Sequence, residues 1–184
     1  PEGISMKTTT LLPAIRSRVG DWNFYVTTLT FAEVAALVHA PDEIHERKHL
    51  ADWIQREAIE AHAQAIADYI HASPQRFLGS LILGVYGGSP DWNPLKVRVQ
   101  QHEEVSDEQL ARIEGTLGLL HLFGTERLFA IDGQHRVAGI KLALSEQPED
   151  SILKTDCVSA IFVAHDPNSD AGKARTRRLF TTVN

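Results

Sequence analysis

The chain has 184 residues, 43% of them hydrophobic and 23% charged, a composition typical of one globular domain with a sizeable core. Its formal net charge of −6 argues against a surface that coats nucleic acid non-specifically, although a local basic patch stays open. No run of about 18 apolar residues occurs, so no membrane partner is expected. The single cysteine, Cys157, excludes an internal disulfide framework and, without a signal-peptide pattern, predicts a cytoplasmic protein.

The two ends of the sequence bear on the domain boundaries. Met6 is a candidate native start, so we interpret residues 1–6 as a candidate remnant of cloning. A helical pattern over residues 170–184 stops in mid-pattern at Asn184. We therefore expect residues 7–184 to form one domain that is truncated at its C-terminus.

The N-terminal part of the chain is predicted to contain a strand and two helices. Residues 22–26 form the strand, and Thr30 and Glu33 have the spacing of a capping box ahead of a short helix. A longer helix is predicted over residues 42–72. Its core-facing stripe comprises Ile54, Ala58, Ala61, Ala65 and Tyr69.

The rest of the chain alternates predicted strands with loops and short helices. We predict a buried strand over 77–86, a loop over 87–94, a half-exposed strand over 95–99 and a helix that begins at Asp107. Segments 117–123 and 127–131 are predicted to pair as a hairpin. A last strand over 157–164 would bury Cys157 in the core. The fold class that follows is α+β, a single compact domain with a mixed sheet and flanking helices.

The stretch from Leu128 to Leu144 predicts a strand, a tight polar turn and a helix. Its apolar run stops at Asp132-Gly133, and Val137, Ile140 and Leu144 then follow helical spacing. A turn of this kind brings free backbone N–H groups and the positive end of a helix dipole to one point. Such a point favours phosphate or another anion.

Five residues of this turn are candidate site residues. Gly133 and Arg136 are candidates for binding phosphate, since an arginine can fork onto phosphate oxygens. Asp132, Gln134 and His135 are catalytic candidates, with His135 donating or shuttling a proton and Gln134 orienting a water or a base. The alternative is a structural turn, in which Asp132 is an ordinary N-cap and Gly133 serves only the turn geometry. Turn physics alone leaves both interpretations open.

Two further patterns bear on function. A basic cluster near the C-terminus gives Arg175, Arg177 and Arg178 as candidate contacts to DNA phosphates, or as a solvated helix face. Residues 45–49 match H-E-x-x-H, the zinc-binding pattern of metalloproteases. Because the middle residues of this match are charged, a solvated helix face is favoured and no metal site is predicted there. The polar pair Gln75-Arg76 is a candidate neighbour of the turn that the sequence leaves unplaced.

The pentapeptide from Asp132 to Arg136 resembles the motif of the DGQHR-domain proteins, whose best-known members are the DndB proteins associated with DNA phosphorothioate modification. Residues 69–77 and 175–184 add to the resemblance, the latter as an R-x-R-R-L-F-x-x-x-N segment. That family is in turn similar to the ParB/sulfiredoxin-like fold, which implies a core of that type. Sulfiredoxin chemistry needs a cysteine where Gln134-His135 stand, so reductase activity is not expected.

The resemblance implies a nucleotide site at the same turn. In ParB-like proteins a G-x-x-R turn holds nucleotide phosphates, and restriction proteins with a D-G-Q-Q-R motif hydrolyse nucleoside triphosphates there. By analogy, Arg136 and the turn amides would bind the phosphates of a nucleoside triphosphate, with ATP the first candidate. His135 or Asp132 would position or activate water, and Mg²⁺ would offset the phosphate charge.

The function implied is a Mg²⁺-dependent NTPase in a DNA modification or defence system. Its candidate partners are DNA, other modification or restriction proteins and a second copy of the chain. One alternative is a non-enzymatic, DNA-binding transcriptional regulator of the phosphorothioate modification genes. Another is a subunit whose role is assembly.

Overall fold

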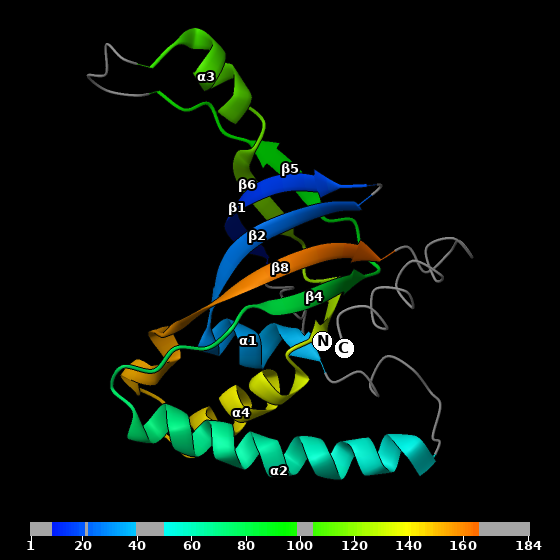
Figure 1. Cartoon of the computed structure of the whole chain (residues 1–184), viewed down its shortest axis with the longest axis vertical. Coiled ribbons are helices and arrows are strands. Elements are labelled where there is room, and N and C mark those ends of the chain that lie inside the picture. Colours follow the sequence, from blue (N-terminus) through cyan, green and yellow to red (C-terminus); the bar gives the residue numbers. More distant parts are fainter. Residues whose placement is uncertain (1–8, 21, 40–49, 99–104, 166–184) are drawn as a thin grey trace, which may run out of the picture.

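The computed structural model describes residues 9–20, 22–39, 50–98 and 105–165, which form one mixed sheet with helices packed on it (Figure 1). The elements in chain order are β1 (Thr10–Val19), β2 (Trp22–Thr30), α1 (Phe31–Leu37), β3 (Val38–His39), α2 (Leu50–Ala72), β4 (Leu81–Tyr86), β5 (Asp91–Pro94), α3 (Asp107–Ile113), β6 (Leu117–Leu122), β7 (Arg127–Asp132), α4 (Gln134–Ser145), the 3₁₀ helix η2 (Ile152–Thr155) and β8 (Cys157–His165).

The sheet has eight strands in the order β3-β7-β4-β8-β2-β1-β6-β5. Strand β3 runs parallel to β7, and β4 runs parallel to β8, whereas the other neighbours are antiparallel. The predicted class is therefore confirmed: an α+β domain with a mixed sheet and flanking helices. Within the described ranges, no helix is long and apolar enough to cross a membrane.

The sheet is strongly curled. Between β6 and β7 the chain has only residues 123–126, and five residue steps span at most about 18 Å. Those two strands are five positions apart in the sheet order, which in a flat sheet would separate them by about 24 Å. The curl also brings the rings of Tyr25 in β2 and Trp92 in β5 into contact, with centroids 5.2 Å apart, although these two strands are three positions apart in the sheet order.

The helices α1, α4 and α2 lie together beside one half of the sheet (Figure 1). Helix α1 contacts β2, and α4 contacts β7, α1 and α2. The α2–α4 contact is close because Gly139 has no side chain: a Cβ there would collide with Ile66. The main core beneath these helices includes Val34, Ile70, Val137 and Ile140.

Local sequence signals for helix starts are confirmed. Thr30 caps α1, since its hydroxyl accepts from the N–H of Glu33 at 3.1 Å while the Glu33 carboxylate accepts from the N–H of Thr30 at 2.8 Å. Ser106 and Gln109 make the same reciprocal pair at the start of α3. These caps need only residues three positions apart, which is why the sequence reveals them.

The predicted hairpin over 124–126 is wrong. Strand β6 pairs with β1 and β5, whereas β7 pairs with β3 and β4. Within the connection, the carboxylate of Glu126 accepts the N–H groups of Phe123, Thr125 and Ser89. The chain crosses here between distant positions of the curled sheet.

The predicted loop over 87–94 and strand over 95–99 are also corrected. The strand is β5, in which Trp92 opposes Leu120 of β6, and residues 95–98 have no regular secondary structure. As an edge strand, β5 tolerates the proline at its end. The strand predicted from residue 77 begins only at Leu81, and Phe77 is 83% exposed.

The predicted core-facing stripe of α2 lies on the wrong face of the helix, as far as the structure describes its side chains. In α2 the buried side chains are Ala63, Ala67 and Ile70, because that face meets α4, whereas the predicted Ala61, Ala65 and Tyr69 are exposed. The side chains of the predicted Ile54 and Ala58 lie outside the described set.

Cys157 is exposed and not in the core. It precedes Val158, Ala160 and Phe162, which are buried on the opposite side of β8. The two-residue period of a strand therefore turns Cys157 outward.

Candidate functional site

The predicted strand–turn–helix is confirmed. Strand β7 ends at Asp132 and α4 begins at Gln134, with Gly133 as N-cap at φ 90° and ψ 20°. This left-handed conformation favours glycine. A Cβ at Gly133 would also lie only 2.7 Å from Cδ2 of Leu81, so there is no space for a side chain.

The alternative interpretation of Asp132 as the N-cap is wrong. Gly133 takes that position, and no side chain accepts a hydrogen bond from the first turn of α4 at the cap. The first intrahelical bond is donated by the N–H of Val137 to the carbonyl of Gly133 at 2.9 Å. The earlier N–H groups of the helix have no carbonyl to reach within it, so this end of α4 keeps the polarity that attracts anions.

Asp132 instead pairs with Arg136 one helical turn later. Nη2 of Arg136 lies 3.1 Å from Oδ2 of Asp132 and also donates to the carbonyl of Ser80 at 3.0 Å. Both side chains are about one third exposed. The guanidinium therefore ties the turn to the segment before β4, and a carboxylate lies at the positive end of the helix dipole.

The other two candidates of the turn point to different neighbours. Nε2 of Gln134 donates to the carbonyl of Ile131 at 2.9 Å, which directs this side chain back onto β7. The ring of His135 lies 4.8 Å from that of His62 in α2, at an interplanar angle of 47°. Nδ1 of His135 and Nε of Arg136 are buried and have no hydrogen-bond partner among the described residues.

The sequence does not reveal the neighbours that complete this site. Gly79 and Ser80 reach Arg136 across 56 residues or more of chain, and His62 approaches His135 from another helix. No short-range pattern marks such contacts. Gly79 lies beside Arg136, since a Cβ there would be in van der Waals contact with Nη1 at 3.4 Å.

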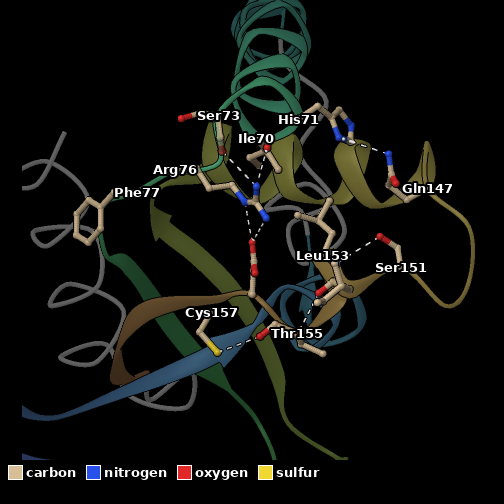
Figure 2. Close-up of polar contacts among 12 residues, drawn as sticks. Ile70, His71, Ser73, Arg76, Phe77, Gln147, Ser151, Leu153, Thr155 and Cys157 are labelled. Carbon is tan, nitrogen blue, oxygen red and sulfur yellow. Dashed lines mark hydrogen bonds and ion pairs between the residues drawn. The ribbon is translucent and has the colours of Figure 1, made fainter.

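Arg76, which the sequence left unplaced, anchors the loop between α2 and β4 (Figure 2). Its Nε donates to Oδ2 of Asp156 at 2.7 Å. Its Nη1 donates to the carbonyls of Ile70 and Ser73 at 3.3 and 3.2 Å, at the end of α2. The guanidinium is thus committed to holding this loop.

Other candidate residues lie outside the described residues. These are Arg175, Arg177 and Arg178, together with the H-E-x-x-H match at 45–49. In the part of the chain that the structure describes, no group of three or more His, Cys, Asp or Glu side chains is placed to hold a metal ion. The turn between β7 and α4 has one carboxylate residue, Asp132, which by itself forms no such group.

These features define an α+β protein in which a buried strand enters a helix through a glycine turn, beside an arginine–carboxylate pair. The chain belongs to the DndB family, described as DNA-sulfur modification-associated, whose family model matches residues 12–184. In the same comparisons, no curated protein and no solved structure matches the chain. The predicted association with DNA-sulfur modification is therefore confirmed at the level of the family.

Proposed function

We propose that this DndB-family protein binds the phosphates of a nucleoside triphosphate, ATP first, at the Asp132–Arg136 turn and hydrolyses it with Mg²⁺. The observation that carries the proposal is the N-terminus of α4, where Gly133 supplies no side-chain cap. Backbone N–H groups there are suited to phosphate oxygens, and the helix dipole favours negative charge.

Phosphate binding requires an exchange of partners at Arg136. The Nη2 atom that now contacts Asp132 would turn to phosphate oxygens, onto which a guanidinium can fork. Asp132 would then be available as a carboxylate ligand. Such a donor fits Mg²⁺, which commonly takes one or two carboxylates together with phosphate oxygens and waters. Bound Mg²⁺ would offset the charge of the phosphate oxygens.

The remaining turn residues would serve the water that attacks the phosphate. His135 or Asp132 would position or activate it, and Gln134 would orient it once released from the carbonyl of Ile131. Nδ1 of His135 is buried and has no hydrogen-bond partner among the described residues, so this atom would have to become accessible before it could contact the water.

We also propose that the core is of the ParB/sulfiredoxin-like type and that Asp132–Arg136 is a DGQHR motif. The succession of β7, the glycine turn and α4 supports both, because Gly133 and Arg136 have the G-x-x-R spacing at a helix start. DNA and other proteins of the modification system are the partners proposed. Arg175, Arg177 and Arg178 are the proposed DNA contacts.

Phosphate release tests the hydrolysis directly. ATP, GTP, CTP and UTP are each incubated with the protein and Mg²⁺, and Arg136→Ala and His135→Ala are compared with the wild type. We expect Arg136→Ala to weaken binding and release by at least about tenfold, since it removes a charge-assisted contact. His135→Ala should slow release and leave binding nearly unchanged.

Matched controls guard against general damage. Arg127→Ala removes an exposed arginine at the opposite end of β7, and His121→Ala removes a histidine on β6. Both should release phosphate at the wild-type rate. Release by the wild type that does not exceed background would contradict the enzymatic proposal.

A non-enzymatic regulator is the second candidate. The contacts of Arg136 with Asp132 and Ser80 favour it, because they satisfy Nη2 of the guanidinium without any ligand. This candidate predicts sequence-selective binding to the promoter DNA of the modification genes, unchanged by nucleotides and by Arg136→Ala.

A further inference from the structure

The loop between α2 and β4 presents an aromatic ring to solvent. Phe77 is 83% exposed, the highest value among the exposed large hydrophobic side chains of the described residues. A phenylalanine in such a position is not part of the core and stabilises the fold little. Single exposed apolar side chains are common, and what distinguishes this ring is its place on the loop that leads to Arg136 through Gly79 and Ser80.

The backbone that carries this ring is held at Phe77 itself and at the residue before it. The N–H of Phe77 donates to the hydroxyl of Tyr69 at 3.0 Å, and the preceding Arg76 is paired with Asp156. Figure 2 shows the Phe77 ring directed away from the contacts of Arg76. An aromatic side chain on a fixed backbone is pre-organised, so it loses little conformational freedom when a ligand binds.

The same loop leads directly to the phosphate site proposed above. Ser80 accepts a hydrogen bond from Arg136, and Gly79 lies against the same guanidinium. Phe77 is two residues before Gly79, so their Cα atoms are at most about 7 Å apart. One ligand with phosphates at one end and a flat aromatic group at the other can therefore span both places.

We propose that Phe77 is the stacking platform for the base of the nucleotide whose phosphates bind at the Asp132–Arg136 turn. This inference rests on the proposed function, because it places the second half of the same ligand. Every base has a π-face, and stacking tolerates different bases. The site therefore selects a nucleotide over inorganic polyphosphate, and it discriminates weakly among ATP, GTP, CTP and UTP.

Calorimetric titrations with ATP and with inorganic tripolyphosphate, both in the presence of Mg²⁺, separate the two halves of the site. Phe77→Ala should weaken ATP binding by about tenfold, as expected for the loss of one stacking contact. It should change tripolyphosphate binding by less than about twofold. Phe77→Leu should resemble Phe77→Ala, whereas Phe77→Trp should retain ATP affinity. Ile152→Ala, which removes another exposed apolar side chain, is the matched control and should change neither affinity.

Each failure has a different meaning. If the wild type binds neither ligand, the proposed phosphate site is wrong and the base platform falls with it. If tripolyphosphate binds and Phe77→Ala leaves ATP affinity unchanged, or weakens both ligands equally, the phosphate site stands and the platform is refuted. Loss of single-stranded DNA binding in Phe77→Ala, with ATP affinity unchanged, would also refute it and assign the ring to DNA bases.

Discussion

At Gly133 the backbone leaves β7 with a positive φ, and Leu81 packs where a side chain would stand. Gly133→Ala therefore combines a strained backbone with a steric collision, and should destabilise the protein by about 2–4 kcal/mol. Gly115→Ala isolates the strain alone, since that residue also has a positive φ but no atom within 4 Å of its Cβ position. It should cost only about 1 kcal/mol. Thermal unfolding of both variants checks the difference, and equal losses would contradict the packing of Leu81 on the turn.

If phosphates bind at the turn as proposed, Asp132 competes with them for Arg136. Asp132→Asn keeps the size of the side chain and removes its charge, so tripolyphosphate should bind about three- to tenfold tighter in the absence of Mg²⁺. With Mg²⁺ present the gain should disappear, because the carboxylate is then a metal ligand. Titrations of wild type and variant in both conditions measure this, with the exposed Asp150→Asn as control. Equal or weaker binding without Mg²⁺ would argue against a phosphate site at this pair.

The turn shows how far sequence reasoning extends at this scale. The change of periodicity and the glycine predicted the positions of β7 and α4 correctly, because both signals are local. The alternative role of Asp132, as the N-cap, is not found, while its proposed role at the site stays a prediction. An aspartate before a glycine at a helix start suits an N-cap, and only the placement of Arg136 and Ser80 draws its carboxylate elsewhere.

Between elements, the tightest described contact on α4 is with α2. Gly139→Ala places a methyl group onto Ile66 and should destabilise the protein by about 1–3 kcal/mol. Ile66→Ala in the same chain should recover part of that loss, because it removes the opposing side chain. A double-mutant cycle by denaturant unfolding measures the coupling. Strictly additive effects would mean that the two helices do not meet at this pair.

The presence of a helix or strand was easier to predict from the sequence than the partner with which a strand pairs. Thr30 and Glu33, three positions apart, predicted the start of α1, and the helix predicted to begin at Asp107 is α3. The partner of β6 could not be found this way, because Leu120 meets Leu12 across more than a hundred residues. Strand β5 was missed because its residues, Asp91–Pro94, are typical of a loop, and its pairing with β6 is a long-range contact that no local pattern encodes.

For the whole molecule, membership of the DndB family makes DNA the partner to test first. The net charge of −6 means that any DNA contact must come from a local cluster, and Arg177 and Arg178 are the candidates from the sequence. Arg177→Glu with Arg178→Glu should weaken binding to duplex DNA. It should also reduce the slope of log affinity against log salt concentration by about 2, which is roughly one unit for each lost phosphate contact.

Arg16→Glu with Arg18→Glu makes the same change of charge on exposed residues of β1 and is the control for non-specific repulsion. If both double variants change affinity and salt slope equally, the C-terminal arginines make no special contact. The cytoplasmic location and self-association of the protein stay predictions.

The arrangement of the strands explains why only part of the candidate site could be predicted from the sequence. Strands β4 and β7 are neighbours in the sheet, and Ile82 pairs with Asp132, so the loop before β4 lies against the start of α4 and Ser80 and Gly79 join a motif that lies far along the chain. The contiguous pentapeptide could be found from sequence. Its partners follow from the long-range pairing of β4 with β7.

The central claim is that nucleotide phosphates bind at the Asp132–Arg136 turn. A crystal structure with a non-hydrolysable ATP analogue and Mg²⁺ tests it most directly. We predict phosphate oxygens within hydrogen-bond distance of the backbone N–H groups at the start of α4 and of the Arg136 guanidinium, with Asp132 turned away from Arg136. Phosphates bound elsewhere, with the Asp132–Arg136 pair intact, would contradict the claim.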